Sequence, residues 1–184
     1  MKATQSLEII ESMLQESKKS LHRNSFYFIL WGSLMVPTGI AESLLLGNPN
    51  FWLIWPIMGT IGGLISWIYG MKEDKRSGVT TAGDRITSYT WGAFLFCMIL
   101  GILFSISNQI PPHTIILMLA GMATFISGGI CRFKPFVWGG IVLEIGAIAC
   151  AFFVDYEYQG YVSAISLTFG YVVPGIILRK SENG

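Results

Sequence analysis

The chain has 184 residues, of which 52% are hydrophobic and only 12% are charged, with a net charge of +1. Soluble domains carry about 25% charged residues, so this composition excludes an ordinary soluble protein. The small net charge also excludes a protein that binds nucleic acid through a strongly basic surface, and we expect no nucleic-acid partner.

The first predicted element is an amphipathic helix over residues 4–22. Its apolar stripe consists of Leu7, Ile10, Leu14 and Leu21. The segment up to Arg23 contains four basic and three acidic residues, a balance too even for strong attraction to anionic lipid. We therefore assign residues 1–23 to a cytoplasmic helix that lies on the membrane surface, covers the mouth of a bundle or docks on a protein partner.

Six apolar segments follow, each close to the ~20 residues that an α-helix needs to cross the hydrocarbon core. They cover residues 24–46, 51–71, 86–107, 113–130, 135–154 and 160–178. Their apolar residues lie almost all around each helix, and polar or Gly/Pro-containing segments separate them. The sequence therefore predicts an all-α membrane protein in which residues 24–184 form a bundle of six transmembrane helices in a lipid bilayer.

All basic residues fall on one side of this predicted topology. The 12 Lys and Arg precede the first span, lie between the second and third or the fourth and fifth, or follow the sixth. The opposite side carries Asp155, Glu157 and His113. By the positive-inside rule we expect both termini in the cytoplasm.

A Trp-Gly pattern recurs near the cytoplasmic ends of the odd-numbered spans, in "FILWGS", "SYTWGA" and "PFVWGG". One interpretation is three helical hairpins in the same orientation, packed with approximate threefold symmetry around a central axis. The alternative is that membrane helices favour interfacial Trp and packing Gly in any case. The pairs Gly59–Gly63 and Ala147–Ala151 predict close helix contacts, within the chain or in a homo-oligomer.

Glu144 lies near the middle of the fifth span, and none of the predicted spans contains Lys or Arg. Gly140, Ala147 and Ala151 share its helix face, so we expect the carboxyl group to turn inward against other helices. An isolated carboxylate in low dielectric is costly, so Glu144 is expected to hold a proton or a cation. Candidate polar neighbours at similar depth are Cys97, Thr124, Ser127, Thr168 and Tyr171.

Two interpretations of Glu144 follow from this position. In the functional one, the side chain binds a proton, a cation or a substrate in a central cavity. In the structural one, it is a neutral hydrogen-bond donor between helices.

A second group of polar residues is predicted at the outer side of the bundle. Its members are Glu42, His113, Asp155 and Glu157. Three carboxylates and an imidazole are groups from which a metal or hydrolytic site can be built. The plainer interpretation is that they are solvated ends of spans and loops.

No catalytic or cofactor motif is found in the sequence. The three Cys show no CxxC spacing, the chain has only two His, and it contains neither GxxxxGK[ST] nor HExxH. We therefore expect no metal, no cofactor and no enzymatic activity.

Four segments combine Trp, Gly and Pro as packing signals: "FILWGS", "IWPIMGTIGGLISWIYG", "ATFISGGICRFKP" and "LTFGYVVPGIIL". Together with the amphipathic start, they resemble a group of uncharacterised bacterial six-span inner-membrane proteins, over nearly the whole chain. The resemblance implies the topology and a location in the bacterial inner (plasma) membrane, but no activity and no functional residue.

The leading functional hypothesis is a small transport or permeation protein for an ion or small solute, with Glu144 as its central polar group. The alternative is a non-catalytic membrane sensor or scaffold that holds a cytoplasmic partner through the N-terminal helix and the segment Lys72–Arg85. A membrane enzyme acting on lipid is a third hypothesis. A continuous polar lining through the bundle would favour transport, and a dry core with an exposed apolar face on the N-terminal helix would favour the scaffold.

Overall fold

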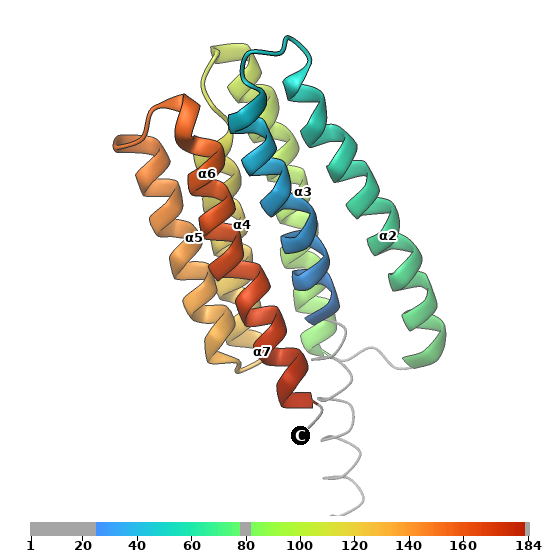
Figure 1. Ribbon diagram of the computed structural model, residues 1–184. Helices are drawn as coiled ribbons and strands as arrows, with labels where there is room; N and C mark the ends of the chain where they lie inside the picture. Colours follow the sequence, from blue (N-terminus) through green and yellow to red (C-terminus); the bar gives the residue numbers. More distant parts are fainter. Residues whose placement is uncertain (1–24, 78–81, 183–184) are drawn as a thin grey trace, which may run out of the picture.

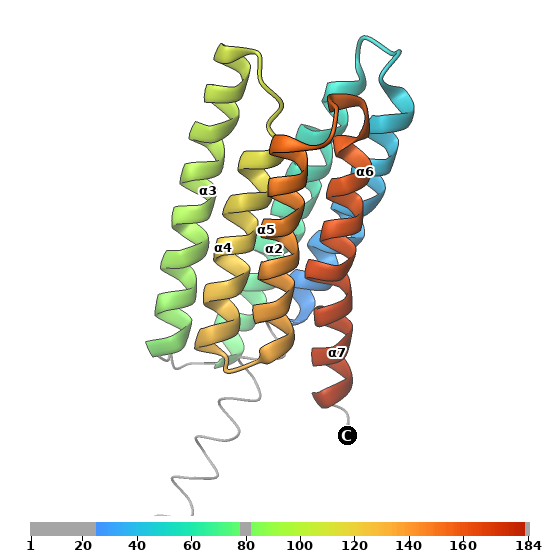
Figure 2. The ribbon, with the colours of Figure 1, turned by 90° about the vertical axis from the view of Figure 1, so that its left-hand side faces the viewer.

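The computed structural model describes residues 25–77 and 82–182, and its regular elements there are all helical (Figure 1, Figure 2). Six helices are long and apolar enough to cross a membrane: Ser25–Leu45, Ile54–Lys72, Asp84–Asn108, His113–Ile130, Lys134–Phe152 and Tyr156–Lys180. The predicted all-α, six-span architecture is confirmed, and it is that of a multi-pass membrane protein. The amphipathic helix predicted for residues 4–22 lies outside the described residues.

The spans form three antiparallel hairpins. The first helix (Ser25–Leu45) leads through the short 3₁₀ helix η1 (Phe51–Leu53) into α2 (Ile54–Ser77). The second hairpin pairs α3 (Ala82–Asn108) with α4 (His113–Ile130). The third pairs α5 (Lys134–Phe152) with a span divided into α6 (Tyr156–Leu167), the π-helical turn η2 (Thr168–Val172) and α7 (Val173–Glu182). Because α2 and α3 extend beyond the membrane spans, most of the segment between Lys72 and Arg85 is helical.

The two ends of the bundle differ in charge. The Lys and Arg residues of the described ranges lie where α2, α4 and α7 end and where α3 and α5 begin, which we call the basic end (Figure 1). Glu42, His113, Asp155 and Glu157 lie at the opposite, acidic end. The predicted segregation of charge along the bundle axis is thus present in the fold.

An aromatic cluster fills the basic half of the bundle. The Phe28 ring stacks on Phe136 with centroids 4.1 Å apart, and it meets the edges of Tyr171 and Trp91 at 5.1 and 5.8 Å. The core extends from this cluster through buried apolar residues of α4, α5 and α6, among them Leu117, Leu143 and Leu167. Rings packed in this way leave little space for water.

The three hairpins do not contribute equally to this core. Within the α2 span only 6% of the residues are buried, against 50% in the sixth span. The first helix, α4, α5 and the sixth span form the centre, whereas α2 and α3 lie at the periphery (Figure 1, Figure 2). The approximate threefold arrangement about a central axis is therefore not what the packing shows.

Glycine pairs let the central helices approach closely. A Cβ atom at Gly39 of the first helix would lie 2.6 Å from the Gly160 carbonyl oxygen of α6. A Cβ at Gly121 of α4 would lie 3.0 Å from the Gly140 carbonyl oxygen of α5. Small residues at such crossings allow the backbone contact on which helix association in lipid depends.

The small-residue pairs predicted from the sequence behave differently. A Cβ at Gly59 or Gly63 would meet nothing within 4 Å among the described residues. Ala147 is buried in the core, whereas Ala151 is exposed. The Gly59–Gly63 pair therefore makes no close helix contact within the described part of the chain. Of the two contacts predicted for this pair, the one within the chain is not found there.

Candidate functional site

Glu144 does not face a central cavity. Its side chain lies in a surface groove of about 470 Å³ between α4 and α5. The other residues that line the groove are all apolar: Met122, Phe125, Ile126, Ile141, Ile145 and Ile148. Five of these six side chains are exposed on the outside of the bundle, where acyl chains would surround them. Glu144 thus packs against another helix, as expected, but it lies at the surface of the bundle, and the expectation of a central position is wrong.

The neighbours of Glu144 on its own helix explain this position. Ile141 and Ile148 lie three residues before and four after it, on the same side of α5, and Ile145 follows directly. The carboxyl Oε1 lies 2.8 Å from where a Cβ at Gly121 would be, so the absence of a side chain on α4 makes room for it. No hydrogen bond or ion pair connects Glu144 with another residue in the ranges 25–77 and 82–182.

The polar residues expected around Glu144 do not gather there. The hydroxyls of Thr124, Ser127 and Thr168 each donate to a carbonyl oxygen four residues earlier in their own helix, at 2.7–2.8 Å. The Tyr171 side chain forms a hydrogen bond with the Thr124 side chain inside the core, whereas Cys97 is exposed on α3. These groups therefore bond within their own helices or to each other, or lie outside the core, and they form no continuous polar lining.

A buried pair at the acidic end has the features of a site. His113 Nε2 lies 2.8 Å from Glu42 Oε2, and the two side chains are only 3% and 6% exposed. Glu42 belongs to the last turn of the first helix and His113 is the first residue of α4. Ionisable groups buried this deeply are tolerated when they are paired, and here the pairing links two helices through residues that are 71 positions apart in the sequence.

Elements of two further helices enclose the Glu42–His113 pair. Gly160 of α6 leaves space for the Glu42 carboxyl group, since a Cβ there would lie 3.3 Å from Oε2. The rings of Trp55 and Tyr156 lie edge-on to the imidazole, with centroids 5.9 and 6.2 Å away. The first helix, α2, α4 and α6 therefore all meet at this pair.

The second imidazole nitrogen of His113 is the unusual atom of the site. Nδ1 is buried and has no hydrogen-bond partner within the described part of the chain. In the neutral ring that donates from Nε2, Nδ1 carries a lone pair, and in the imidazolium it carries a hydrogen. A proton gained or lost at this ring would therefore alter both the charge of the pair and the hydrogen bond that Nδ1 requires.

The other two outer-side candidates stay at the surface. Asp155 is the N-cap residue of α6 and Glu157 lies in its first turn, where a carboxylate interacts favourably with the helix dipole. Among residues 25–77 and 82–182, no three His, Cys, Asp or Glu side chains are grouped so that they could hold a metal ion. Of the four candidates, only Glu42 and His113 come together.

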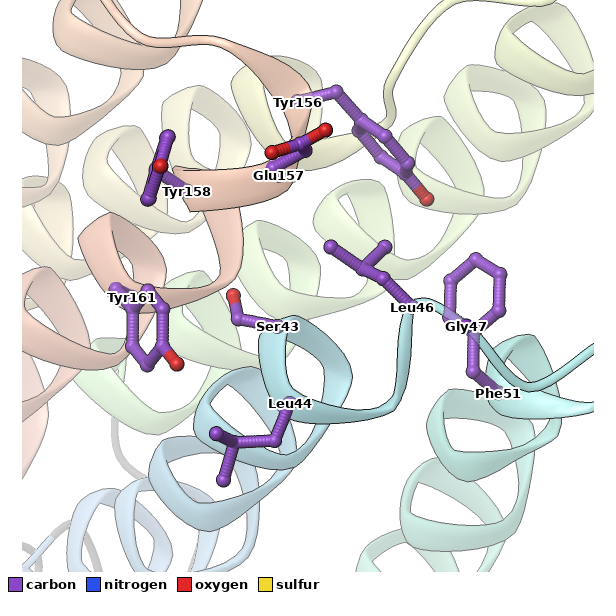
Figure 3. A pocket seen from close by; sticks show the side chains of 9 residues that line it. All are labelled: Ser43, Leu44, Leu46, Gly47, Phe51, Tyr156, Glu157, Tyr158 and Tyr161. Atoms are coloured by element: carbon purple, nitrogen blue, oxygen red, sulfur yellow. The ribbon is translucent and has the colours of Figure 1, made fainter.

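A pocket of about 560 Å³ opens beside the pair at the acidic end (Figure 3). It lies between the end of the first helix with its following turn and the beginning of α6. Its lining consists of Ser43, Leu44, Leu46, Gly47, Phe51, Tyr156, Glu157, Tyr158 and Tyr161. Tyr156 belongs to both places, because it lines the pocket and also contacts the His113 ring.

The Glu42–His113 pair could be anticipated only in part. The sequence places both residues at the outer side of the predicted bundle. It does not reveal that the first helix and α4 are neighbours, which decides whether the two side chains meet. The signal that was available is that His113 is one of only two histidines and the only one next to a span end on that side.

The chain matches no family model, no curated protein and no solved structure.

Proposed function

We propose that the chain is a non-catalytic membrane sensor that responds to a proton at its acidic end through the Glu42–His113 pair. The observation that supports this proposal is the 2.8 Å contact between two buried, ionisable side chains on different helices. Histidine is the side chain whose charge changes most readily near neutral pH, and buried histidines are used as proton switches.

The position of the pair connects protonation with helix packing. Gain or loss of a proton changes the net charge of a buried pair by one, and a buried charge that loses its partner is strongly disfavoured. Glu42 lies on the first helix, which crosses Gly160 of α6 closely through Gly39. A weaker Glu42–His113 contact would therefore loosen the first helix from α4 and α6, and the rigid helix would carry that shift to the basic end.

The proposal includes an orientation and a location. The basic end faces the cytoplasm of a bacterial inner membrane, because Lys and Arg collect at that end and the positive-inside rule governs such segments. The acidic end then samples the outer medium. A cytoplasmic protein partner would bind at the basic end, through the N-terminal segment and the residues between Lys72 and Arg85.

Transport of an ion or small solute is the second candidate. The observation in its favour is the interrupted sixth span, in which the π-helical turn η2 precedes Pro174. Interrupted helices occur at functional sites and line the binding sites of many transporters. The packed aromatic cluster around Phe28 and Phe136 argues for the sensor, because transport would require this cluster to open.

The test uses the full chain in lipid nanodiscs with isotope-labelled histidine. Only His22 and His113 contribute ring signals, and His22→Gln assigns them. The native cysteines are first removed by Cys97→Ser, Cys131→Ser and Cys150→Ala. A ¹⁹F label on Ser33→Cys, at an exposed position of the first helix, then reports the packing of that helix. A sensor requires that a pH titration changes the His113 signal and the ¹⁹F signal with the same midpoint.

Two matched variants separate the hypotheses. Glu42→Gln should abolish the ¹⁹F response, whereas Glu144→Gln should leave it unchanged. A ¹⁹F signal that stays constant while His113 titrates would refute the sensor. Proton or cation flux in proteoliposomes that disappears in Glu42→Gln would instead establish transport.

A further inference from the structure

We propose that the pocket between the first helix and α6 binds the ammonium group of a small organic cation. The pocket lies beside the Glu42–His113 pair and shares only Tyr156 with its surroundings, and binding there does not depend on the pair acting as a sensor. Its volume of about 560 Å³ falls within the few hundred to a thousand Å³ that small-molecule sites occupy.

The charges of the pocket favour a cation. Glu157 supplies a carboxylate, and none of the nine lining residues is Lys or Arg. The nearby Asp155 is also acidic, and the basic residues of the described ranges lie at the far end of the bundle. A cation therefore meets an attractive potential here, whereas an anion is repelled.

The rings of the pocket favour an organic cation over a metal ion. Four of the nine lining residues are aromatic: Phe51, Tyr156, Tyr158 and Tyr161. Aromatic faces attract alkylammonium groups through the ring quadrupole, and the leucine side chains of the pocket can contact alkyl groups. Only one carboxylate lines the pocket, which is too few for a metal site of the usual kind.

A hydroxyl group adds a polar contact at the wall of the pocket. The Ser43 Oγ atom is buried and has no hydrogen-bond partner among the described residues. Figure 3 shows it on the side of the first helix that faces α6, near Tyr161 and below Glu157. A ligand that carries a hydroxyl or N–H group beside its cationic centre could bond to this oxygen.

The test compares two ligands of nearly equal shape that differ in charge. Choline carries a trimethylammonium group, and 3,3-dimethylbutan-1-ol carries a neutral tert-butyl group in its place. Both are titrated against the full chain in dodecyl maltoside micelles, which contain no charged or ammonium groups, and binding is followed by ligand-observed NMR. We expect choline to bind at least about tenfold more tightly, because cation–π contacts and a carboxylate attract the charged ligand and not the neutral one.

Matched variants locate the binding. Glu157→Gln removes the charge from the lining and should weaken choline binding about tenfold or more. Asp155→Asn removes a carboxylate that does not line the pocket and should change the affinity less than about twofold, as expected of a solvent-screened charge. Equal affinity for the neutral ligand, equal effects of the two variants, or displacement of choline by potassium at the same concentration would each overturn the proposal.

The ammonium group could come from a free solute or from a lipid headgroup, since the pocket lies at the end of the membrane spans. Nanodiscs with and without phosphatidylcholine distinguish the two sources. If added phosphatidylcholine blocks choline binding, the headgroup occupies the pocket, and if it does not, the site takes a free cation. His113 signals are a separate measurement, so failure of the sensor and failure of this site are distinguishable.

Discussion

Two glutamates in the spans show how strongly the environment decides the behaviour of one residue type. Glu42 is buried and bonded to His113, whose ring contacts the rings of Trp55 and Tyr156. Glu144 lies in an open apolar groove and has no bonded partner in the described ranges. The first arrangement compensates an ionisable group within the protein, whereas the second leaves a polar group against hydrocarbon.

The same substitution should therefore have opposite effects at these two positions. Glu42→Leu leaves the buried imidazole of His113 without its partner and should lower the free energy of unfolding by about 3 kcal/mol. Glu144→Leu replaces an unbonded carboxyl group by an apolar side chain and should raise the free energy of unfolding by about 1 kcal/mol. Equilibrium unfolding in mixed micelles of mild detergent and SDS measures both. A large loss of stability in Glu144→Leu would contradict its position in a lipid-facing groove.

At the scale of elements, the tryptophans of the recurring Trp-Gly motif lie in three different surroundings. Trp31 packs over Gly62 of α2, where an added Cβ would lie 3.1 Å from the ring. Trp91 donates from Nε1 to the Ser127 hydroxyl of α4 at 3.2 Å. Trp138 is 65% exposed on α5. Similar sequence motifs thus lie in unlike surroundings, which agrees with the general preference of membrane helices for interfacial Trp.

The interruption of the sixth span has a local cause. Pro174 has no N–H group and cannot bond to the carbonyl oxygen of Gly170, four residues earlier. The helix adopts the π-helical turn Thr168–Val172, which is separated from the proline by one residue. The freed Gly170 carbonyl oxygen faces α5, where a Cβ at Gly139 would lie only 2.5 Å away. Glycine at position 139 is therefore required for this close contact.

A glycine at a helix crossing and a glycine in open space provide a matched pair of substitutions. Gly160→Ala would place a methyl group against the Gly39 carbonyl oxygen and the Ser43 hydroxyl, and should lower the free energy of unfolding by about 2 kcal/mol. Gly59→Ala meets nothing within 4 Å in the described part of the chain and should raise it by about 0.5–1 kcal/mol. Thermal unfolding in detergent compares them. Equal effects would mean that the first helix does not cross α6 at Gly160.

At the scale of the molecule, burial and charge follow different axes. Burial is greatest in the first helix, α4, α5 and the sixth span, so α2 and α3 expose most of their surface to the surroundings. Charge is divided along the bundle, with cations at one end and the Glu42–His113 pair and its pocket at the other. A proton or solute at the acidic end is therefore separated from the basic end by the aromatic cluster of the core.

The proposed orientation predicts which end an impermeant reagent can reach. Asn50→Cys lies in the exposed turn before η1 at the acidic end and Lys180→Cys lies in α7 at the basic end, each in a background that lacks Cys97, Cys131 and Cys150. An impermeant maleimide should label Asn50→Cys on intact cells and Lys180→Cys only after the membrane is permeabilised. The reverse pattern would invert the orientation and place the Glu42–His113 pair in the cytoplasm.

The length and spacing of the apolar segments determined the six spans, because a helix must satisfy its own backbone hydrogen bonds across a layer of fixed thickness. The order of the basic residues likewise determined which span ends lie together. Which face of α5 meets other helices was decided only by the tertiary structure, since small residues and isoleucines flank Glu144 on different sides. The contact between Glu42 and His113 was also decided by the tertiary structure, because it requires the first helix and α4 to be neighbours. The spacing of residues along the chain does not reveal which helices pack side by side.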